Sequence, residues 1–142
     1  METGQVRKRV VEALQALRAQ EQQRRGRNAD AERDFGTFLD LVATPLAKQV
    51  AGALKAEGYA LTVFTPGRGL RIALEKGRDD FVELLLDTEG DVPQVVGRIS
   101  YTRGSRTIVE DIPVQAGTGP ESLSEETVLD FLLRALRPLL SR

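Results

Sequence analysis

The chain lacks the two side chains that most often perform enzyme chemistry near neutral pH. Its 142 residues include no histidine and no cysteine. Histidine is the usual general base and the commonest metal ligand, and cysteine supplies the thiolates of structural zinc sites and many nucleophiles. Carboxylate, lysine, serine and tyrosine groups remain, and they form no recognisable catalytic arrangement. We therefore expect no enzyme activity, no catalytic residue, no cofactor and no metal centre.

Carboxylates gather in three places, none with the spacing of a known site. Asp79 and Asp80 follow Arg78 in a predicted turn, and we interpret them as a solvated hairpin end. Glu110 and Asp111 are neighbours in a predicted strand, so they point to opposite faces and cannot easily share a ligand. The third group alternates like part of a calcium loop but lacks the terminal glutamate of that motif. It consists of Asp87, Glu89 and Asp91.

The most basic part of the predicted sheet is a hairpin end that contains Arg103 and Arg106, two candidate interaction residues. Arg78 is expected at the same end, and Tyr101 is close by. Basic groups beside stacking aromatics are typical of nucleic-acid binding. The net charge of -1, however, gives no overall attraction for nucleic acid. We interpret these side chains as solvated and do not expect a nucleic-acid partner.

A five-stranded meander between Tyr59 and Val114 would position these groups. Five apolar runs are separated by turn sequences that contain glycine, in one case with proline. Connections this short join antiparallel neighbours, because a parallel crossover needs a dozen or more residues. The predicted strands are Tyr59–Thr65, Gly69–Glu75, Phe81–Asp87, Val95–Thr102 and Ser105–Val114.

Apolar alternation predicts which face of this sheet is buried. A two-residue first turn places Leu61 opposite Ile72, and a four-residue turn shifts the pairs by two. If Arg103-Gly104 is the last loop, Ile99 lies opposite Ile108. A shift of two residues keeps every side chain on its face, whereas a shift of one would reverse them all. The register of the sheet is therefore well specified by the alternation.

The second face of the predicted sheet mixes charged and apolar side chains, although a solvated face should be polar throughout. Either a helix of the same chain covers part of it, or it is a surface for a partner or ligand. Arg98 could reach Asp111 diagonally across the last hairpin. The interaction residues predicted on this face are Phe64, Arg71, Leu85, Val96, Arg98 and Val109.

Helical periodicity precedes the meander. Residues Gln5–Gln23 form a helix with a thin apolar stripe, which includes the candidate contacts Val10, Leu14 and Leu17. Gly26 is expected to interrupt that helix, with Asn28 as the N-cap of the next. The next helix covers residues 29–58 and packs on the apolar face of the sheet. Within it, Pro45 predicts a kink, or a new start with Thr44 as N-cap. Gly58 is the expected C-cap.

After the meander, Ser124 is the expected N-cap of a C-terminal helix that Pro138 ends. Its apolar arc predicts packing against the second helix or against the second face of the sheet. The expected fold class is thus α+β: two N-terminal helices, a five-stranded antiparallel meander sheet, and a C-terminal helix packed on the sheet. Residues 1–28 form an N-terminal helix and linker, and residues 29–142 a single α+β domain. That domain contains the long helix 29–58, the meander 59–114 and the C-terminal helix 123–138.

Bulk composition narrows the class of protein. With 41% hydrophobic and 29% charged residues, the chain has the composition of a globular protein. Its apolar runs are too short for a membrane span, so a cytoplasmic location is expected. We favour a non-catalytic protein–protein interaction or assembly module that self-associates. The alternative is a small-molecule-binding protein with a pocket between sheet and helices. Its expected polar lining is Tyr59, Arg71, Glu83 and Arg98.

Overall fold

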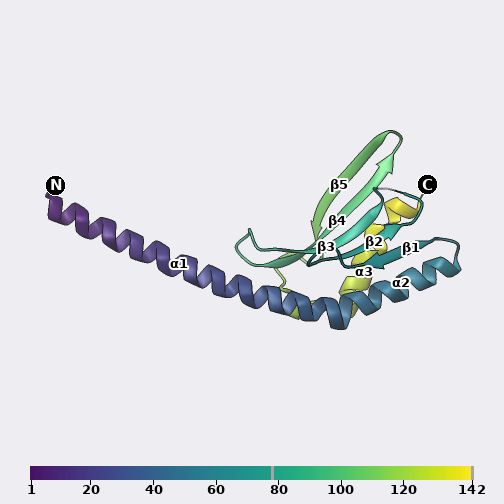
Figure 1. Cartoon of the computed structure of the whole chain (residues 1–142), viewed down its shortest axis with the longest axis horizontal. Coiled ribbons are helices and arrows are strands. Elements are labelled where there is room, and N and C mark those ends of the chain that lie inside the picture. Colours follow the sequence, from purple (N-terminus) through teal and green to yellow (C-terminus); the bar gives the residue numbers. More distant parts are fainter. Residues whose placement is uncertain (78, 142) are drawn as a thin grey trace. The chain divides into compact units, whose positions relative to one another are not determined.

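The structure, a computed structural model, describes residues 1–77 and 79–141, and Figure 1 shows the order of its elements. The chain divides into two compact units, Met1–Asp30 and Ala31–Arg142. The expected α+β class with a five-stranded antiparallel sheet and a C-terminal helix is confirmed. The helical elements are α1 (Thr3–Phe38), a π-helical turn η1 (Leu39–Ala43), α2 (Thr44–Ala56), a 3₁₀ turn η2 (Pro120–Ser122) and α3 (Glu125–Leu140). The strands are β1 (Leu61–Phe64), β2 (Leu70–Leu74), β3 (Phe81–Asp87), β4 (Gln94–Arg103) and β5 (Arg106–Pro113).

The predicted break between two N-terminal helices is wrong. α1 continues through Gly26 and Asn28 without interruption and ends only at Phe38. A glycine inside a helix costs about 1 kcal/mol relative to alanine. Helical residues on both sides of Gly26 supply hydrogen bonds that offset this cost, so glycine alone is too weak a signal to end the helix.

The irregularity expected at Pro45 takes the form of a π-turn. Pro45 lies in the first turn of α2, but Thr44 begins that helix and does not cap it. The five preceding residues are π-helical, and the Thr44 N–H donates to the Leu39 carbonyl five residues back. Proline has no N–H and crowds the carbonyl four residues before it. A wider turn directly before Pro45 accommodates both effects without ending the helical path.

The end of α2 and the start of α3 show how local sequence fixes helix boundaries. Gly58, with a φ of +95°, closes α2. Its N–H donates to the Lys55 carbonyl, while the next N–H donates to the Leu54 carbonyl, which is the Schellman pattern. At the start of α3, Ser124 Oγ accepts from the Thr127 N–H at 3.1 Å, as predicted. The predicted end at Pro138 is wrong, because α3 continues to Leu140. Leu139, which is buried, anchors this last turn in the core.

The strands pair in sequence order from β1 to β5, and all pairs are antiparallel. In the first hairpin Val63 lies opposite Ile72, which is the register of the longer of the two predicted turns. The last hairpin corrects its prediction: Arg103 pairs with Arg106, so the loop is Gly104-Ser105. Gly104 has a φ of +62°, and glycine is favoured at the first position of such two-residue loops. The shift is two residues, so each side chain keeps its predicted face.

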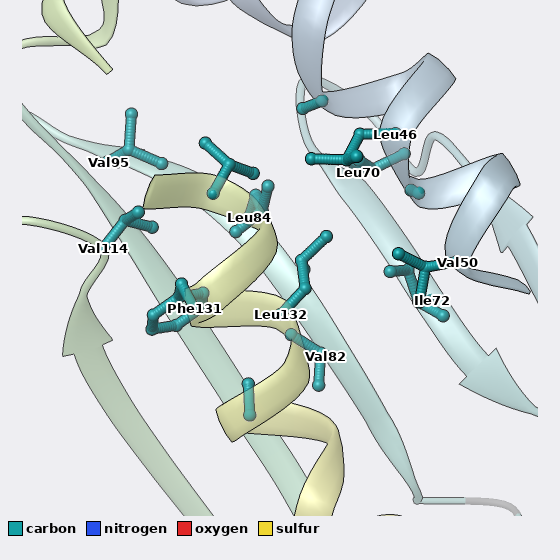
Figure 2. Close-up of a cluster of buried hydrophobic side chains, with 14 of the residues drawn as sticks. Leu46, Val50, Leu70, Ile72, Val82, Leu84, Val95, Val114, Phe131 and Leu132 are labelled. Atoms are coloured by element: carbon teal, nitrogen blue, oxygen red, sulfur yellow. The ribbon is translucent and has the colours of Figure 1, made fainter. Parts of the chain in front are cut away.

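The core lies between one face of the sheet and two helices, α2 and α3 (Figure 2). From α2, Leu46 and Val50 pack with Leu70 and Ile72 of β2. From α3, Leu132 packs with strand residues such as Leu84. Within the unit Ala31–Arg142, both helices therefore pack on the face that alternation predicted to be buried. The alternative in which the C-terminal helix covers the second face is wrong, because its wide apolar arc is shared between the sheet and α2.

In the described part of the chain, no helix combines the length and apolar character needed to cross a bilayer.

Candidate interaction surface on the open sheet face

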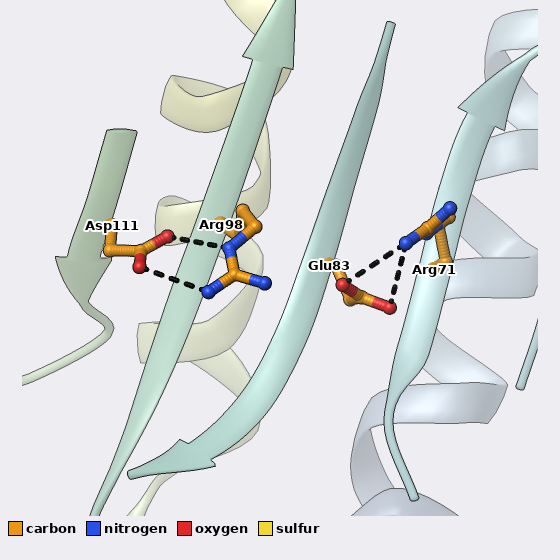
Figure 3. A network of polar contacts seen from close by, with 4 residues as sticks. All are labelled: Arg71, Glu83, Arg98 and Asp111. Carbon is orange, nitrogen blue, oxygen red and sulfur yellow. Dashed lines mark hydrogen bonds and ion pairs between the residues drawn. The ribbon is translucent and has the colours of Figure 1, made fainter. Parts of the chain in front are cut away.

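We call the sheet face opposite α2 and α3 the open face. It brings together six of the predicted interaction residues, which come from all five strands: Phe64, Arg71, Leu85, Val96, Arg98 and Val109. Phe64 and Val109 are 41% and 56% exposed. Among residues 31–77 and 79–141, the helices α2 and α3 lie behind the other face (Figure 3). The open face thus presents apolar groups that this unit does not bury.

Four charged residues form one row across this face, which we call the charge row. Arg71 lies opposite Glu83, Glu83 opposite Arg98, and Arg98 opposite Asp111. The row therefore crosses β2, β3, β4 and β5 with charges that alternate in sign (Figure 3). Side chains directly opposite on neighbouring strands are close enough to interact, and opposite charges there are stabilising.

Arg98 on β4 and Asp111 on β5 form one ion pair of the charge row. Arg98 Nε donates to Asp111 Oδ1 at 2.9 Å, and Nη2 donates to Oδ2 at 3.2 Å. The hydrogen bond and the charge of Asp111 raise the pKa of Arg98 above its ordinary value, with a smaller contribution from the charge of Glu83. The predicted contact is present, but it is direct and not diagonal. The shift of the hairpin loop to Gly104-Ser105 places the two residues opposite each other.

Arg71 on β2 and Glu83 on β3 form the other ion pair of the charge row. Arg71 Nη2 lies 3.2 Å from Glu83 Oε1 and 3.3 Å from Oε2, so one nitrogen contacts both oxygens. The guanidinium stacks on the ring of Phe81 at 4.0 Å and lies 5.8 Å from the centre of the Phe64 ring. Glu83 is only 5% exposed. A buried carboxylate is costly unless it is paired, and here the guanidinium provides that pairing.

Apolar side chains flank the charge row on both sides along the strands. Phe81 and Val109 lie on one side, each two residues along its strand from a charge of the row. Leu85 and Val96 lie opposite each other on the other side. Next to them is a hollow of about 530 Å³, which extends along the ends of β3, β4 and β5. Its lining includes Leu85, Asp87, Glu89, Val96, Arg98 and Pro113.

The charged groups of this face are paired with one another. Each charge of the row faces an opposite charge, and neither row pair includes a nucleophile positioned by a base. Within residues 1–77 and 79–141, no group of three or more acidic side chains could hold a metal ion. The face therefore combines paired charges with exposed apolar side chains.

Arg103 and Arg106 lie apart from this surface. They pair with each other at the tip of the last hairpin, are exposed, and point to the opposite side of the sheet from Arg98. Arg103 stacks over Tyr101 at 5.5 Å. Two like charges directly opposite each other repel, so solvation is their main stabilisation. The expected contribution of Arg78 to this cluster falls outside the described residues.

Val10, Leu14 and Leu17 belong to the unit Met1–Asp30 and are exposed, as is every residue from 1 to 26. The helix therefore presents an apolar stripe that its own unit does not bury.

Asp80 corrects the interpretation of its turn as solvated. It is 1% exposed, and its Oδ1 accepts the Thr102 N–H at 2.8 Å. Asp80 thus holds the turn after β2 against β4. The sequence contains no signal for this contact, because it joins residues 22 positions apart.

Comparison of the chain with protein-family models, with curated proteins and with solved structures found no match.

Proposed function

We propose that this protein is a non-catalytic assembly module that self-associates through the open face of its sheet. The observation that supports the proposal is the composition of that face. Large apolar side chains lie beside paired charges, and α2 and α3 pack on the other side. Protein–protein interfaces combine apolar and polar groups in this way, with aromatic residues and arginine enriched.

Light scattering behind size exclusion tests the proposal. At high protein concentration we expect a mass of at least twice the 15.6 kDa of one chain, and a lower mass on dilution. Replacing Val109 with glutamate should shift the mass toward that of one chain, because a charge then enters the apolar part of the open face. A single-chain mass at every concentration would refute self-association.

A matched control separates this effect from a general loss of apolar surface. Leu133 of α3 is 52% exposed, close to the 56% of Val109, but it lies on a helix packed behind the sheet. Leu133→Glu should leave the mass unchanged. An equal loss of association in both variants would show that the open face has no special role.

The stripe of α1 is a second candidate contact between copies. Removing Met1 to Arg25 should change the number of chains in the assembly, because it removes Val10, Leu14 and Leu17. At a concentration where both proteins are single chains, the melting temperature of the unit Ala31–Arg142 should stay the same, since the removed residues are all exposed. Leu14→Ser with Leu17→Ser in the full chain tests the stripe itself. An unchanged number of chains in both variants would exclude α1 as an assembly element.

A small-molecule-binding function is supported by the hollow of about 530 Å³, a volume typical of ligand pockets. This hollow lies at the end of the open face and not between sheet and helices, where the alternative prediction placed its pocket. Arg98 and Asp111 line it. Native mass spectrometry of the purified protein distinguishes this function, because a bound ligand would add a fixed mass to each chain.

A further inference from the structure

We infer that two copies of this chain pack with their open faces together, related by a two-fold axis parallel to the strands. The charge row is complementary to itself under this operation and sets the register between the two copies. This inference rests on the proposed self-association and specifies the partner and its orientation. In this arrangement Arg71 lies opposite the partner's Asp111, and Glu83 lies opposite the partner's Arg98. By symmetry Arg98 lies opposite the partner's Glu83, and Asp111 lies opposite the partner's Arg71.

The sign pattern of the row leads to this arrangement. From β2 to β5 the charges are plus, minus, plus, minus. A two-fold axis parallel to the strands, between β3 and β4, reverses the order of the partner's row. An alternating row with an even number of charges then has an opposite charge against every member. A two-fold axis along the row would instead place each residue against its own copy, and all four contacts would be repulsive.

The apolar flanks of the row also match under the same operation. Leu85 of β3 and Val96 of β4 are direct neighbours on one side of the row. The axis between these strands places Leu85 opposite the partner's Val96. On the other side, Ala73 lies opposite the partner's Val109. A two-fold interface must be self-complementary in this way, and stacked sheets commonly pack with their strands nearly aligned.

The two kinds of contact have different roles. Burial of the apolar flanks supplies the free energy of association. The charges select the register, because like charges brought together across an interface are strongly unfavourable, whereas an opposite pair often gains little beyond its desolvation cost. The charge row therefore distinguishes a second copy in one orientation from other orientations and from other proteins.

The test separates the role of the row within one chain from its role between chains. Arg98→Glu alone breaks the pair with Asp111 and leaves half of the contacts between copies opposite in sign. Adding Asp111→Arg restores an ion pair between β4 and β5 but makes the row plus, minus, minus, plus. That row is its own mirror, so every charge meets its like across the axis. The double variant should be more stable than Arg98→Glu and yet associate more weakly, with a dissociation constant at least about 100-fold above that of the unmodified chain.

A complementary variant should restore association. Arg71→Glu with Glu83→Arg gives minus, plus, plus, minus, and it should also fail to associate alone. Mixed with Arg98→Glu/Asp111→Arg, it places opposite charges at all four positions, so the two chains should form a mixed dimer. Mass spectrometry of the intact complexes identifies that composition. Circular dichroism checks the fold of each variant, and Arg98→Lys/Asp111→Glu, which keeps every sign, should associate within about 10-fold of the unmodified chain.

The results distinguish this inference from the proposed function. If the unmodified chain stays single at all concentrations, self-association itself is refuted. If it associates, and Arg98→Glu/Asp111→Arg associates as tightly as the unmodified chain or more tightly than Arg98→Glu, the two-fold register is wrong while self-association stands. This comparison remains decisive even if the Arg71→Glu/Glu83→Arg chain does not fold.

Discussion

Replacing Gly97 with alanine should lower the free energy of unfolding by about 2–3 kcal/mol, the upper range for overpacking a core. Gly97 lies on the core face of β4, and the ring of Phe131 from α3 occupies the place of its side chain. A β-carbon at Gly97 would come within 2.1 Å of Phe131 Cζ and 2.4 Å of Cε1. Phe131 is buried, so its ring cannot move without disturbing other contacts. Urea denaturation at low protein concentration measures the effect.

Two controls give this prediction its specificity. Gly36→Ala in α1 meets no atom within 4 Å of the new β-carbon. It should stabilise the protein by about 0.5–1 kcal/mol, because alanine is the better helix former. Phe131→Leu should relieve much of the Gly97→Ala penalty when the two are combined. A neutral Gly97→Ala would show that α3 does not pack on this part of the sheet.

Removing the guanidinium of Arg71 should cost about 2 kcal/mol, because Arg71→Ala leaves the buried Glu83 carboxylate without its ion pair. Breaking a fully buried pair costs about 3–5 kcal/mol. The smaller value is expected here because the Arg71 side chain is 31% exposed and Arg98 still faces Glu83 from the next strand. The stacking of Arg71 on Phe81 is lost as well. Denaturation at a concentration where the protein is a single chain measures this cost.

A second substitution identifies the cause. Adding Glu83→Gln to Arg71→Ala removes the unpaired charge and should recover part of the lost stability. Arg98→Ala, which breaks the more exposed pair with Asp111, should cost only about 0–1 kcal/mol. If Glu83→Gln fails to rescue Arg71→Ala, the cost comes from lost packing of the arginine and not from the buried charge.

The composition of the candidate site was predictable, but its contacts were only partly so. Alternation in each strand assigned Phe64, Arg71, Arg98 and Val109 to one face, and the pairing of the strands agrees. The continuous charge row was missed, because it requires the register of four strands at once. The information was available in the shared face of Glu83 with the arginines on either side. That these residues bind a partner remains a prediction.

The predicted helix boundaries were wrong where each rested on the helix propensity of a single residue. Gly26 and Pro138 both disfavour helix, yet α1 and α3 continue through them. In a helix interior, glycine costs about 1 kcal/mol and proline about 3 kcal/mol relative to alanine. Helical hydrogen bonds on both sides can offset the cost at Gly26, and the buried neighbour Leu139 can offset the cost at Pro138. Ser124 and Gly58 were predicted correctly because capping depends on atoms within a few residues of the cap.

Local sequence patterns were enough to predict the number and order of the strands and which side chains share a face of the sheet. Those properties follow from a period of two residues and from short turns, which are local and which a shift of two residues preserves. The folded structure was needed to establish which residues lie opposite each other, that α3 packs beside α2, and that Phe131 fills the space left by Gly97. These depend on turn conformation and on contacts between distant segments, whose energies no local pattern encodes. The charge row exists because both levels agree: alternation set the face, and the observed register aligned the charges.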